Sequence, residues 1–356
     1  MTSHPRLRPA LTSLPAYVPG ARPRGYEVKL SSNENPFPPS AAVVEAVARA
    51  AEEVHRYPDM TALPLRLALA NELGVEADQL VAGNGSVAVL SHVLAAVCEA
   101  GDEVVMPWRS FEAYPIAAVV AGARPVQVPL TSEHRHDIAG LLAAITDRTR
   151  AVLVCSPNNP TGTVVSEAEL AELLAGVPRE VLVVLDEAYR DFAQVDGPVA
   201  DGVELLRRHP NLLVLRTFSK AYALAGLRVG YAVAGRHLAA AVQATATPFG
   251  VNALGQAAAL AALGEGERRR RQVTQIVAER ERVVAELRSH GWHIGDSRAN
   301  FFWFAAADHP PQLVTARCAA AGVLVRAFPE GVRVSVGQRT DNDRLLSGLG
   351  RWSGEK

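Results

Sequence analysis

Lysine is rare in this chain, and one lysine stands where a free amine could do chemistry. The 356 residues include 36 lysines and arginines, of which only Lys29, Lys220 and Lys356 are lysines. Codon bias in a GC-rich genome explains the general shortage. A guanidinium stays protonated, however, whereas an amine can lose its proton and attack a carbonyl group. Because Lys220 directly follows an apolar run typical of a buried strand, it is our candidate nucleophile.

Five apolar runs of the sequence are each followed by a segment with polar or small residues. The runs span residues 79–82, 103–106, 151–155, 181–185 and 212–215. Such runs suit buried strands of a mostly parallel sheet, and ligands of open α/β sheets bind beyond the carboxyl ends of the strands. We therefore expect the segments that follow the runs to meet at one edge of the sheet: residues 83–86, 107–111, 156–162, 186–189 and 217–220.

The segment Gly-Asn-Gly-Ser at residues 83–86 precedes a predicted helix and could cradle a phosphate group. Backbone N–H groups and the helix dipole at such a turn both favour an anion. An ordinary turn between a strand and a helix looks the same, so the motif alone decides nothing. Thr217 and Ser219 add hydroxyl donors, and Arg228 adds a positive charge.

Four further residues could bind a flat aromatic ring. Asp186 ends an apolar run, where an unpaired carboxylate is costly, so it either caps a helix or holds a pyridine nitrogen protonated. Phe111 is either an ordinary core aromatic residue or a ring-stacking face, and Tyr189 and Asn159 can donate to a phenolate oxygen. Together with the amine of Lys220 and the phosphate cradle, these groups match the parts of one cofactor, pyridoxal 5′-phosphate.

The same glycine turn also fits a dinucleotide-binding fingerprint. Gly83, Gly85 and Ala88 match the pattern G-x-G-x-x-A. That fingerprint expects an acidic residue at the far end of the next strand, where it would meet a ribose. Asp102 and Glu103 instead stand at the beginning of the next strand, so a nicotinamide-dependent enzyme is the weaker interpretation.

Composition excludes several other classes of protein. The formal net charge of −1 favours neither a nucleic-acid nor an anionic-membrane partner, and acidic neighbours make the run 268–271 (Arg-Arg-Arg-Arg) a solvated helix face. No apolar run approaches the ~20 residues of a membrane span, and residues 1–23 do not form a secretory signal. Cys98, Cys155 and Cys318 are isolated, which argues against a metal site or disulfide framework and favours a cytoplasmic location.

The element pattern predicts an α/β fold with a large and a small domain. Residues 1–35 contain five prolines from Pro5 to Pro23 and are expected to form an irregular arm that packs with the small domain. Strands alternating with helices predict a large domain at 36–250. A long charged helix near 265–290 and short strands near 301–305, 323–326 and 332–336 predict a small α+β domain at 251–356.

The ordered motifs resemble the fold-type I pyridoxal-phosphate-dependent aminotransferases, within the class-II family. They are Gly-Asn-Gly-Ser, Ser-Pro-Asn-Asn-Pro-Thr-Gly, Asp-Glu-Ala-Tyr, Thr-Phe-Ser-Lys and Gly-Leu-Arg, flanked by residues 17–20, 31–36 and 333–337. Within this family the chain is similar to the branch of histidinol-phosphate and aromatic amino acid aminotransferases. The resemblance implies a mostly parallel seven-stranded sheet flanked by helices, a pyridoxal phosphate cofactor and a homodimer.

The resemblance also implies a role for individual residues. Lys220 would form the imine with the cofactor and then shuttle a proton, and Asp186 would pair with the pyridinium nitrogen. Tyr189 and Asn159 would hold the phenolic oxygen, and Phe111 would stack on the ring. The remaining cofactor-binding residues would be Gly85, Ser86, Val87, Thr217, Ser219 and Arg228.

Residues outside the cofactor-binding set would complete the site. Tyr57 would reach the phosphate bound by the neighbouring subunit of the homodimer. Arg333 would clamp the substrate carboxylate, which suits the bidentate fork of arginine. Tyr17, Asn35 and Arg326 would line the substrate pocket.

The motifs specify the cofactor more closely than the substrate. Many histidinol-phosphate relatives have Asp-Glu where this chain has Val87 and Ala88, and residues 107–115 look like the aromatic amino acid subgroup. We therefore expect an aromatic amino acid as donor and 2-oxoglutarate as acceptor. Histidinol phosphate is the alternative donor, because Arg326 and Arg333 together could bind its phosphate. Ligand sensors of transcriptional regulators share such domains, but residues 1–35 are too short and too rich in proline to supply the DNA-binding domain that those proteins carry.

Overall fold

A seven-stranded sheet forms the centre of the larger part of the molecule. The computed structural model describes residues 5, 8–12, 14, 25 and 27–354. In order across the sheet, the strands are β2 (Leu80–Gly83), β8 (Gly230–Ala234), β7 (Leu212–Thr217), β6 (Leu182–Asp186), β5 (Thr149–Cys155), β3 (Glu103–Trp108) and β4 (Arg124–Pro129). Within this described sheet β8 alone runs antiparallel to its neighbours, which confirms the expected mostly parallel sheet.

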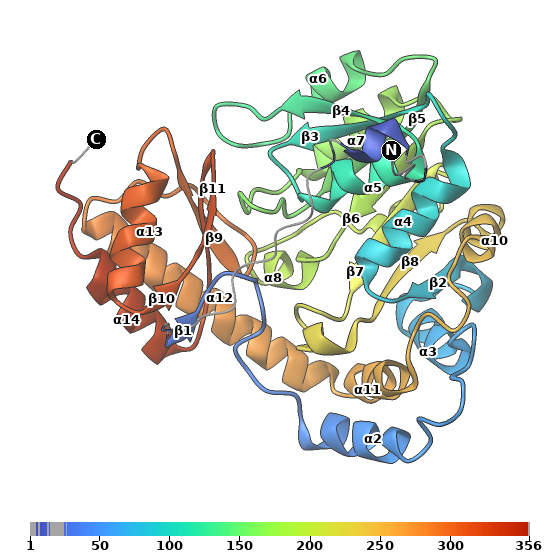
Figure 1. Ribbon diagram of the computed structural model, residues 1–356, viewed down its shortest axis with the longest axis horizontal. Coiled ribbons are helices and arrows are strands. Elements are labelled where there is room, and N and C mark those ends of the chain that lie inside the picture. The colour runs from blue at the N-terminus through green and yellow to red at the C-terminus, as the bar shows by residue number, and fades with distance from the viewer. Residues whose placement is uncertain (1–4, 6–7, 13, 15–24, 26, 355–356) are drawn as a thin grey trace.

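Helices cover both faces of the sheet because its central strands are apolar on both sides (Figure 1). Along β5, Ala151 and Leu153 pack on one face, while Val152 and Val154 pack on the other. The first face is covered by α4 (Ser86–Val97), α5 (Ala113–Ala121) and α10 (Arg236–Ala244). The second face is covered by α6 (Ile138–Ala143), α7 (Glu167–Gly176) and α9 (Gly202–Leu205).

Another group of helices packs where β2 and β8 lie at one side of the sheet. It consists of α2 (Ala41–Ala51), α3 (Leu63–Leu73) and α11 (Ala253–Leu263). The sequence analysis assigned residues 251–356 to the small domain, but Ala258, Ala259 and Ala262 of α11 share a core with β2 and β8. We therefore propose that the small domain begins close to the start of α12 (Gly266–Ser289).

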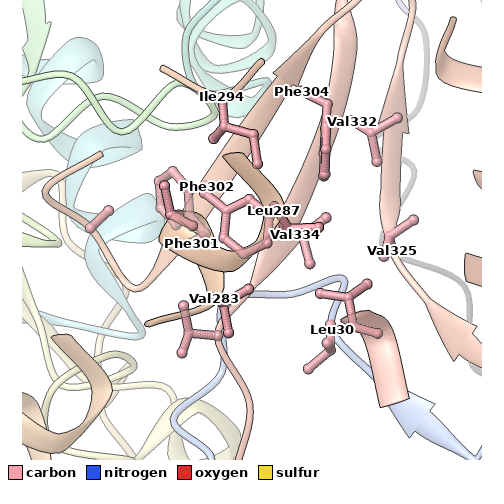
Figure 2. Packing of buried hydrophobic residues seen from close by; sticks show 14 of the residues in the cluster. Leu30, Val283, Leu287, Ile294, Phe301, Phe302, Phe304, Val325, Val332 and Val334 are labelled. Carbon is pink, nitrogen blue, oxygen red and sulfur yellow. The ribbon is translucent and has the colours of Figure 1, made fainter. Parts of the chain in front are cut away.

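The smaller part is built on an antiparallel sheet of β11 (Arg326–Phe328), β12 (Gly331–Ser335) and β9 (Phe301–Ala305). Phe302, Phe304 and Val334 of this sheet pack with Leu287 of α12 in the core drawn in Figure 2. Helices α13 (Pro311–Ala320) and α14 (Arg339–Leu349) complete it. The strand expected at 323–326 is divided between β10 (Val323–Leu324) and β11.

The N-terminal arm touches both parts of the molecule. Strand β1 (Val28–Lys29) pairs with β10 of the smaller part. In contrast to the expected irregular arm, α1 (Pro9–Thr12) is a short helix, and proline is tolerated in the first turn of a helix. Arg8 beside it donates to the carbonyl groups of Val119 and Val120 at 3.1 and 2.9 Å, so this segment lies on α5 of the large domain. None of the helices in the described part is long and apolar enough to cross a membrane.

A buried arginine joins α12 to α8 (Arg190–Val195). Arg280 is 1% exposed, and its Nη2 lies 2.7 and 2.8 Å from the carboxylate oxygens of Asp196, which directly follows α8. Nη1 donates to the carbonyl of Ala299 at 2.9 Å, and Nη2 also donates to Glu281. The ion pair therefore fixes the helix of the small domain against the large domain.

Replacing Asp196 is expected to destabilise the fold far more than replacing the other partner of the same arginine. Asp196→Ala leaves a buried guanidinium short of its main counter-charge, which costs on the order of 3 kcal/mol. Glu281 is 65% exposed, so Glu281→Ala should cost less than about 1 kcal/mol. Urea unfolding followed by circular dichroism measures both changes, and equal losses would contradict this role of Asp196.

Candidate active site

A cavity of about 260 Å³ lies at the carboxyl ends of the central strands. Its lining brings together most of the candidate site residues, from the segments expected at this edge of the sheet and, for Arg326 and Arg333, from the antiparallel sheet of the smaller part. They are Ser86, Val87, Phe111, Asn159, Asp186, Tyr189, Thr217, Ser219, Lys220, Arg228, Arg326 and Arg333. Segments that are far apart in the sequence thus form one site, because parallel strands place their carboxyl ends together.

Three described candidates lie outside the lining of the cavity, and one of them, Gly85, is the N-cap residue of α4. Asn35 donates to the carbonyl groups of Lys220 and Ala221, both at 3.3 Å, so it supports the chain around the lysine. Tyr57 is 82% exposed and stacks on Phe249 with ring centroids 4.5 Å apart. Tyr17 lies outside the described residues.

The amine of Lys220 is buried in the cavity, near both positively and negatively charged side chains. Its Nζ donates to the carbonyl of Ser32 at 3.3 Å and lies 5.7 Å from the ring centre of Tyr189. Burial lowers the pKa of Lys220 to about 7, and the positive charges of Arg333 and Arg228 act in the same direction. At neutral pH a substantial fraction of this amine is therefore unprotonated and nucleophilic.

The carboxyl group of Asp186 ends β6 on the floor of the cavity. Oδ2 accepts from the hydroxyl of Tyr114 at 2.8 Å, and Oδ1 accepts from the backbone N–H of Ala188 at 3.1 Å. Burial raises the pKa of Asp186 to about 6. The N-cap of α8 is Tyr189, so the alternative that Asp186 caps this helix is wrong. The sequence analysis missed Tyr114, which stands three residues after Phe111 and is the second residue of α5 in the structure.

A cup of donors forms where α4 begins. Gly85 precedes the helix with φ of 86°, and a Cβ atom there would collide with the guanidinium of Arg228. Arg228 itself has φ of 58°, and its Nη1 donates to Ser219 Oγ at 3.3 Å. Thr217 Oγ1 accepts from the N–H of Ser219 at 3.1 Å. Together with the first N–H groups of α4, these side chains could hold an anion.

Loop residues before α2 hold Tyr189 in a network that the sequence analysis missed. Asn33 Nδ2 donates to the Tyr189 hydroxyl at 3.0 Å, and Asn33 Oδ1 accepts from Ser335 Oγ at 3.0 Å. Asn300 Nδ2 donates to the carbonyl of Asn33 at 3.1 Å. The motif around Asn33 was recognised, but its spacing does not show which asparagine turns inward. A φ of 52° at Asn33, which asparagine tolerates better than most residues, directs it there.

Arg333 reaches the cavity from β12 of the small domain and is 7% exposed. Its Nη1 donates to Asn159 Oδ1, and its Nη2 donates to the carbonyl of Ser31 at 2.7 Å. The bond from Arg333 fixes Asn159 with its oxygen toward the arginine, so its N–H₂ group is the part that can donate to a ligand. The orientation of Asn159 in the cavity thus depends on how the small domain packs against the large domain.

Comparison with known proteins agrees with this arrangement. The family model "Aminotransferase class I and II" matches residues 27–349. An aromatic amino acid aminotransferase of Streptomyces avermitilis is 50% identical over 99% of this chain and 98% of its own. One of Thermobifida fusca is also 50% identical, over 96% of each chain. The chain belongs to the class I and II aminotransferases.

Solved structures of aminotransferases share the fold. Histidinol-phosphate aminotransferase from Sinorhizobium meliloti, in complex with pyridoxal 5′-phosphate, has a TM-score of 0.88 with 28% identity. The match covers 98% of this chain and 97% of that one. It confirms the expected fold-type I architecture of this aminotransferase, and the family match confirms the enzyme class.

Two ion pairs cross from the large to the small domain of the aminotransferase near the cavity. Arg326 Nη2 donates to Glu112 Oε2 at 2.9 Å, and both side chains line the cavity. Arg109 donates to both carboxylate oxygens of Glu330 at 3.0 Å. The sequence analysis named Arg326 but not its acidic partner, because pairing across domains has no signature in local spacing.

Acylation of the cofactor-free aminotransferase at Lys220 is expected to rise with pH through a mid-point near 7. A lowered pKa means that the reactive neutral amine predominates above that value. Trace labelling with acetic anhydride, read by mass spectrometry of the peptide that contains Lys220, measures the profile. Free Nα-acetyl-lysine, which titrates at about 10.4, serves as the reference.

Arg333→Gln should move this mid-point to higher pH, since one positive charge that opposes protonation is removed. A mid-point above about pH 9 for the unaltered protein would contradict the prediction, because it would show that the surroundings of Lys220 do not lower the pKa of its amine toward neutrality.

Proposed function

We propose that this aminotransferase moves the amino group of an aromatic amino acid to 2-oxoglutarate, with pyridoxal 5′-phosphate as cofactor. The observation that carries the proposal is a single cavity that contains the amine of Lys220, the carboxyl group of Asp186 and an anion cup. Two proteins named aromatic amino acid aminotransferase, each 50% identical over nearly the full length, support the substrate class.

The residues present fit the parts of the cofactor. The cup at the start of α4 would hold the phosphate. The close approach of the Arg228 guanidinium to Gly85 would explain why position 85 is a glycine. Lys220 would form the covalent link, and Asp186 would face the ring nitrogen. Phe111 would lie against the ring, with Tyr189 and Asn159 at its phenolic oxygen. When bound, the cofactor supplies the electron sink that stabilises negative charge on the substrate Cα.

Binding of a cationic ring nitrogen would change the state of Asp186. Burial favours its protonated form, whereas an adjacent positive charge favours the carboxylate. Tyr114 and the backbone N–H of Ala188 already donate to this group, so it is oriented before the ligand arrives. Asp186 would thereby keep the ring nitrogen protonated without any rearrangement of its own.

The substrate would be oriented by arginine and deprotonated by lysine. Arg333 would bind the α-carboxylate with its guanidinium fork. Lys220, whose pKa burial lowers to about 7 in the cavity without ligand, would take the proton from the substrate Cα as a general base. The resulting ammonium group then returns a proton as a general acid. Tyr189 would remain a neutral donor, because burial raises the pKa of its hydroxyl.

The charge state of the cavity favours the aromatic donor over histidinol phosphate. Arg326, which could bind a phosphate together with Arg333, is already paired with Glu112 at 2.9 Å. A phosphate dianion would have to displace this carboxylate, whereas an uncharged aromatic side chain would not. Histidinol phosphate remains the second candidate because the solved structure with a TM-score of 0.88 is a histidinol-phosphate aminotransferase.

A homodimer is part of the proposal. Tyr57 and Phe249 stack on each other at the surface, 82% and 38% exposed. Other large apolar side chains on α2, α3, α11 and the segment between α2 and α3 are also exposed: Val44, Val54, Met60, Leu63, Leu67 and Leu260. A second copy of the chain would cover this surface and would bring its Tyr57 to the phosphate cup.

We also propose a cytoplasmic location for the enzyme. Its cysteines, Cys98, Cys155 and Cys318, are free and buried. Burial raises the pKa of the Cys155 thiol, which lines the cavity, to about 12. Reduced thiols of this kind are ordinary in a reducing compartment.

Steady-state kinetics with 2-oxoglutarate as acceptor test the proposed donor. Phenylalanine and tyrosine should have kcat/KM values at least about tenfold above that of histidinol phosphate, equivalent to about 1.4 kcal/mol. The reason is that Glu112 neutralises Arg326. A preference of the same size for histidinol phosphate would overturn the aromatic assignment and leave the aminotransferase assignment intact.

Mixing two impaired variants tests the position of Tyr57. Tyr57→Ala should weaken cofactor binding about tenfold or more through loss of a bond to a charged phosphate, and Lys220→Ala should be inactive. In a mixed dimer, the chain with Lys220 receives an intact Tyr57 from its partner, so activity at limiting cofactor should recover. A mixture that stays as weak as Tyr57→Ala alone would mean that Tyr57 acts within its own subunit or not at all.

A further inference from the structure

Glu112 and Arg326 form a charged pair inside the cavity, on opposite sides of the domain junction. Glu112 precedes α5 of the large domain, and Arg326 begins β11 of the small domain. The bond from Arg326 Nη2 to Glu112 Oε2 is 2.9 Å long. The side chains are only 14% and 28% exposed for Arg326 and Glu112, so water screens the pair less than a surface pair.

The position of Glu112 in the fold does not require this carboxylate. Glu112 occupies the N-cap of α5, but within the described chain its side chain makes no capping hydrogen bond. Its backbone has φ of −59° and ψ of −21°, which any residue adopts. The carboxylate is instead committed to Arg326, whose guanidinium also lies 5.2 Å from the ring centre of Phe328. The contact that distinguishes Glu112 is therefore the one across the cavity.

The two substrates of the proposed reaction need opposite charges at this place. An aromatic donor carries an uncharged side chain, and an unpaired buried guanidinium facing it would be unfavourable. The dicarboxylic acceptor carries a second carboxylate, for which an arginine is the natural partner. One arginine can serve both if an acidic residue neutralises it in the first case and gives way in the second.

We propose that Glu112 is a specificity-determining residue: it neutralises Arg326 while an aromatic donor is bound, and the distal carboxylate of the acceptor displaces it. This inference rests on the proposed function. Glu112 thereby makes the aromatic donor acceptable and reduces the affinity for every substrate with a distal anion. A phosphate-bearing donor, with about two negative charges, is disfavoured most.

A matched control shows whether Glu112 only holds the two domains together. Arg109 and Glu330 form another ion pair across the junction near the cavity, with a shortest N–O distance of 2.9 Å. Among the described residues, the cavity lining includes Glu112 and Arg326 but neither Arg109 nor Glu330. Loss of the Arg109–Glu330 pair therefore removes an ion pair between the domains without changing the charge in the cavity.

The test compares Glu112→Gln with Glu330→Gln by single-turnover kinetics of each half-reaction. For Glu112→Gln, the ratio of kcat/KM for 2-oxoglutarate to that for phenylalanine should rise about threefold or more. The corresponding ratio for histidinol phosphate to phenylalanine should rise at least as much. Glu330→Gln should leave both ratios as in the unaltered enzyme. Glu112→Asp, which keeps the charge, should return the ratios toward those of the unaltered enzyme.

Each outcome decides the matter. Unchanged ratios in Glu112→Gln, or an equal change in Glu330→Gln, would overturn the role of Glu112 while phenylalanine transamination by the unaltered enzyme still supports the proposed function. If the unaltered enzyme does not use phenylalanine, the proposed function fails and this inference fails with it. If Glu112→Gln does not fold, Glu112→Asp and Glu112→Ala provide the comparison, and matching ratios in these two variants would also refute the role.

Discussion

Burial at the carboxyl edge of the sheet places the amine of Lys220 and the carboxyl group of Asp186 in one cavity, and the remaining contacts of the site depend on it. The same desolvation lowers the pKa of the lysine and raises that of the aspartate, so both groups shift toward their uncharged forms. Such a cavity is prepared for a ligand that supplies the missing charges. A phosphate group would meet Arg228 and the start of α4, and a cationic ring nitrogen would meet Asp186.

In the proposed reaction, the small domain would contribute substrate recognition, and the large domain would contribute the reactive groups. Arg333 and Arg326 both come from its antiparallel sheet and enter a cavity whose floor belongs to the large domain. Their placement depends on the junction between the domains, where Arg280 pairs with Asp196 and Arg109 pairs with Glu330. The proposed chemistry at Lys220 and the proposed selection of the substrate would therefore depend on different parts of the chain.

The sequence was enough to predict the candidate site residues that directly follow strands, because parallel strand direction brings their carboxyl ends to the same edge of the sheet. Lys220, Asp186 and the glycine turn before α4 are of this kind. Partners that depend on tertiary contacts were missed: Tyr114 beneath Asp186, Asn33 beside Tyr189 and Glu112 beside Arg326. Strand β8 was missed because its short run Gly-Tyr-Ala-Val-Ala has weak strand character. The packing of α11 on α2 and α3 was missed because it depends on tertiary contacts.

The most direct test of the account is the site at which the cofactor becomes attached. The protein is incubated with pyridoxal 5′-phosphate, reduced with borohydride and digested, and the modified peptides are identified by mass spectrometry. The account predicts a single major adduct on the peptide that contains Lys220, with exposed Lys29 as the internal control for unspecific reaction. Attachment at Lys29 alone, or active enzyme without any adduct at position 220, would contradict it.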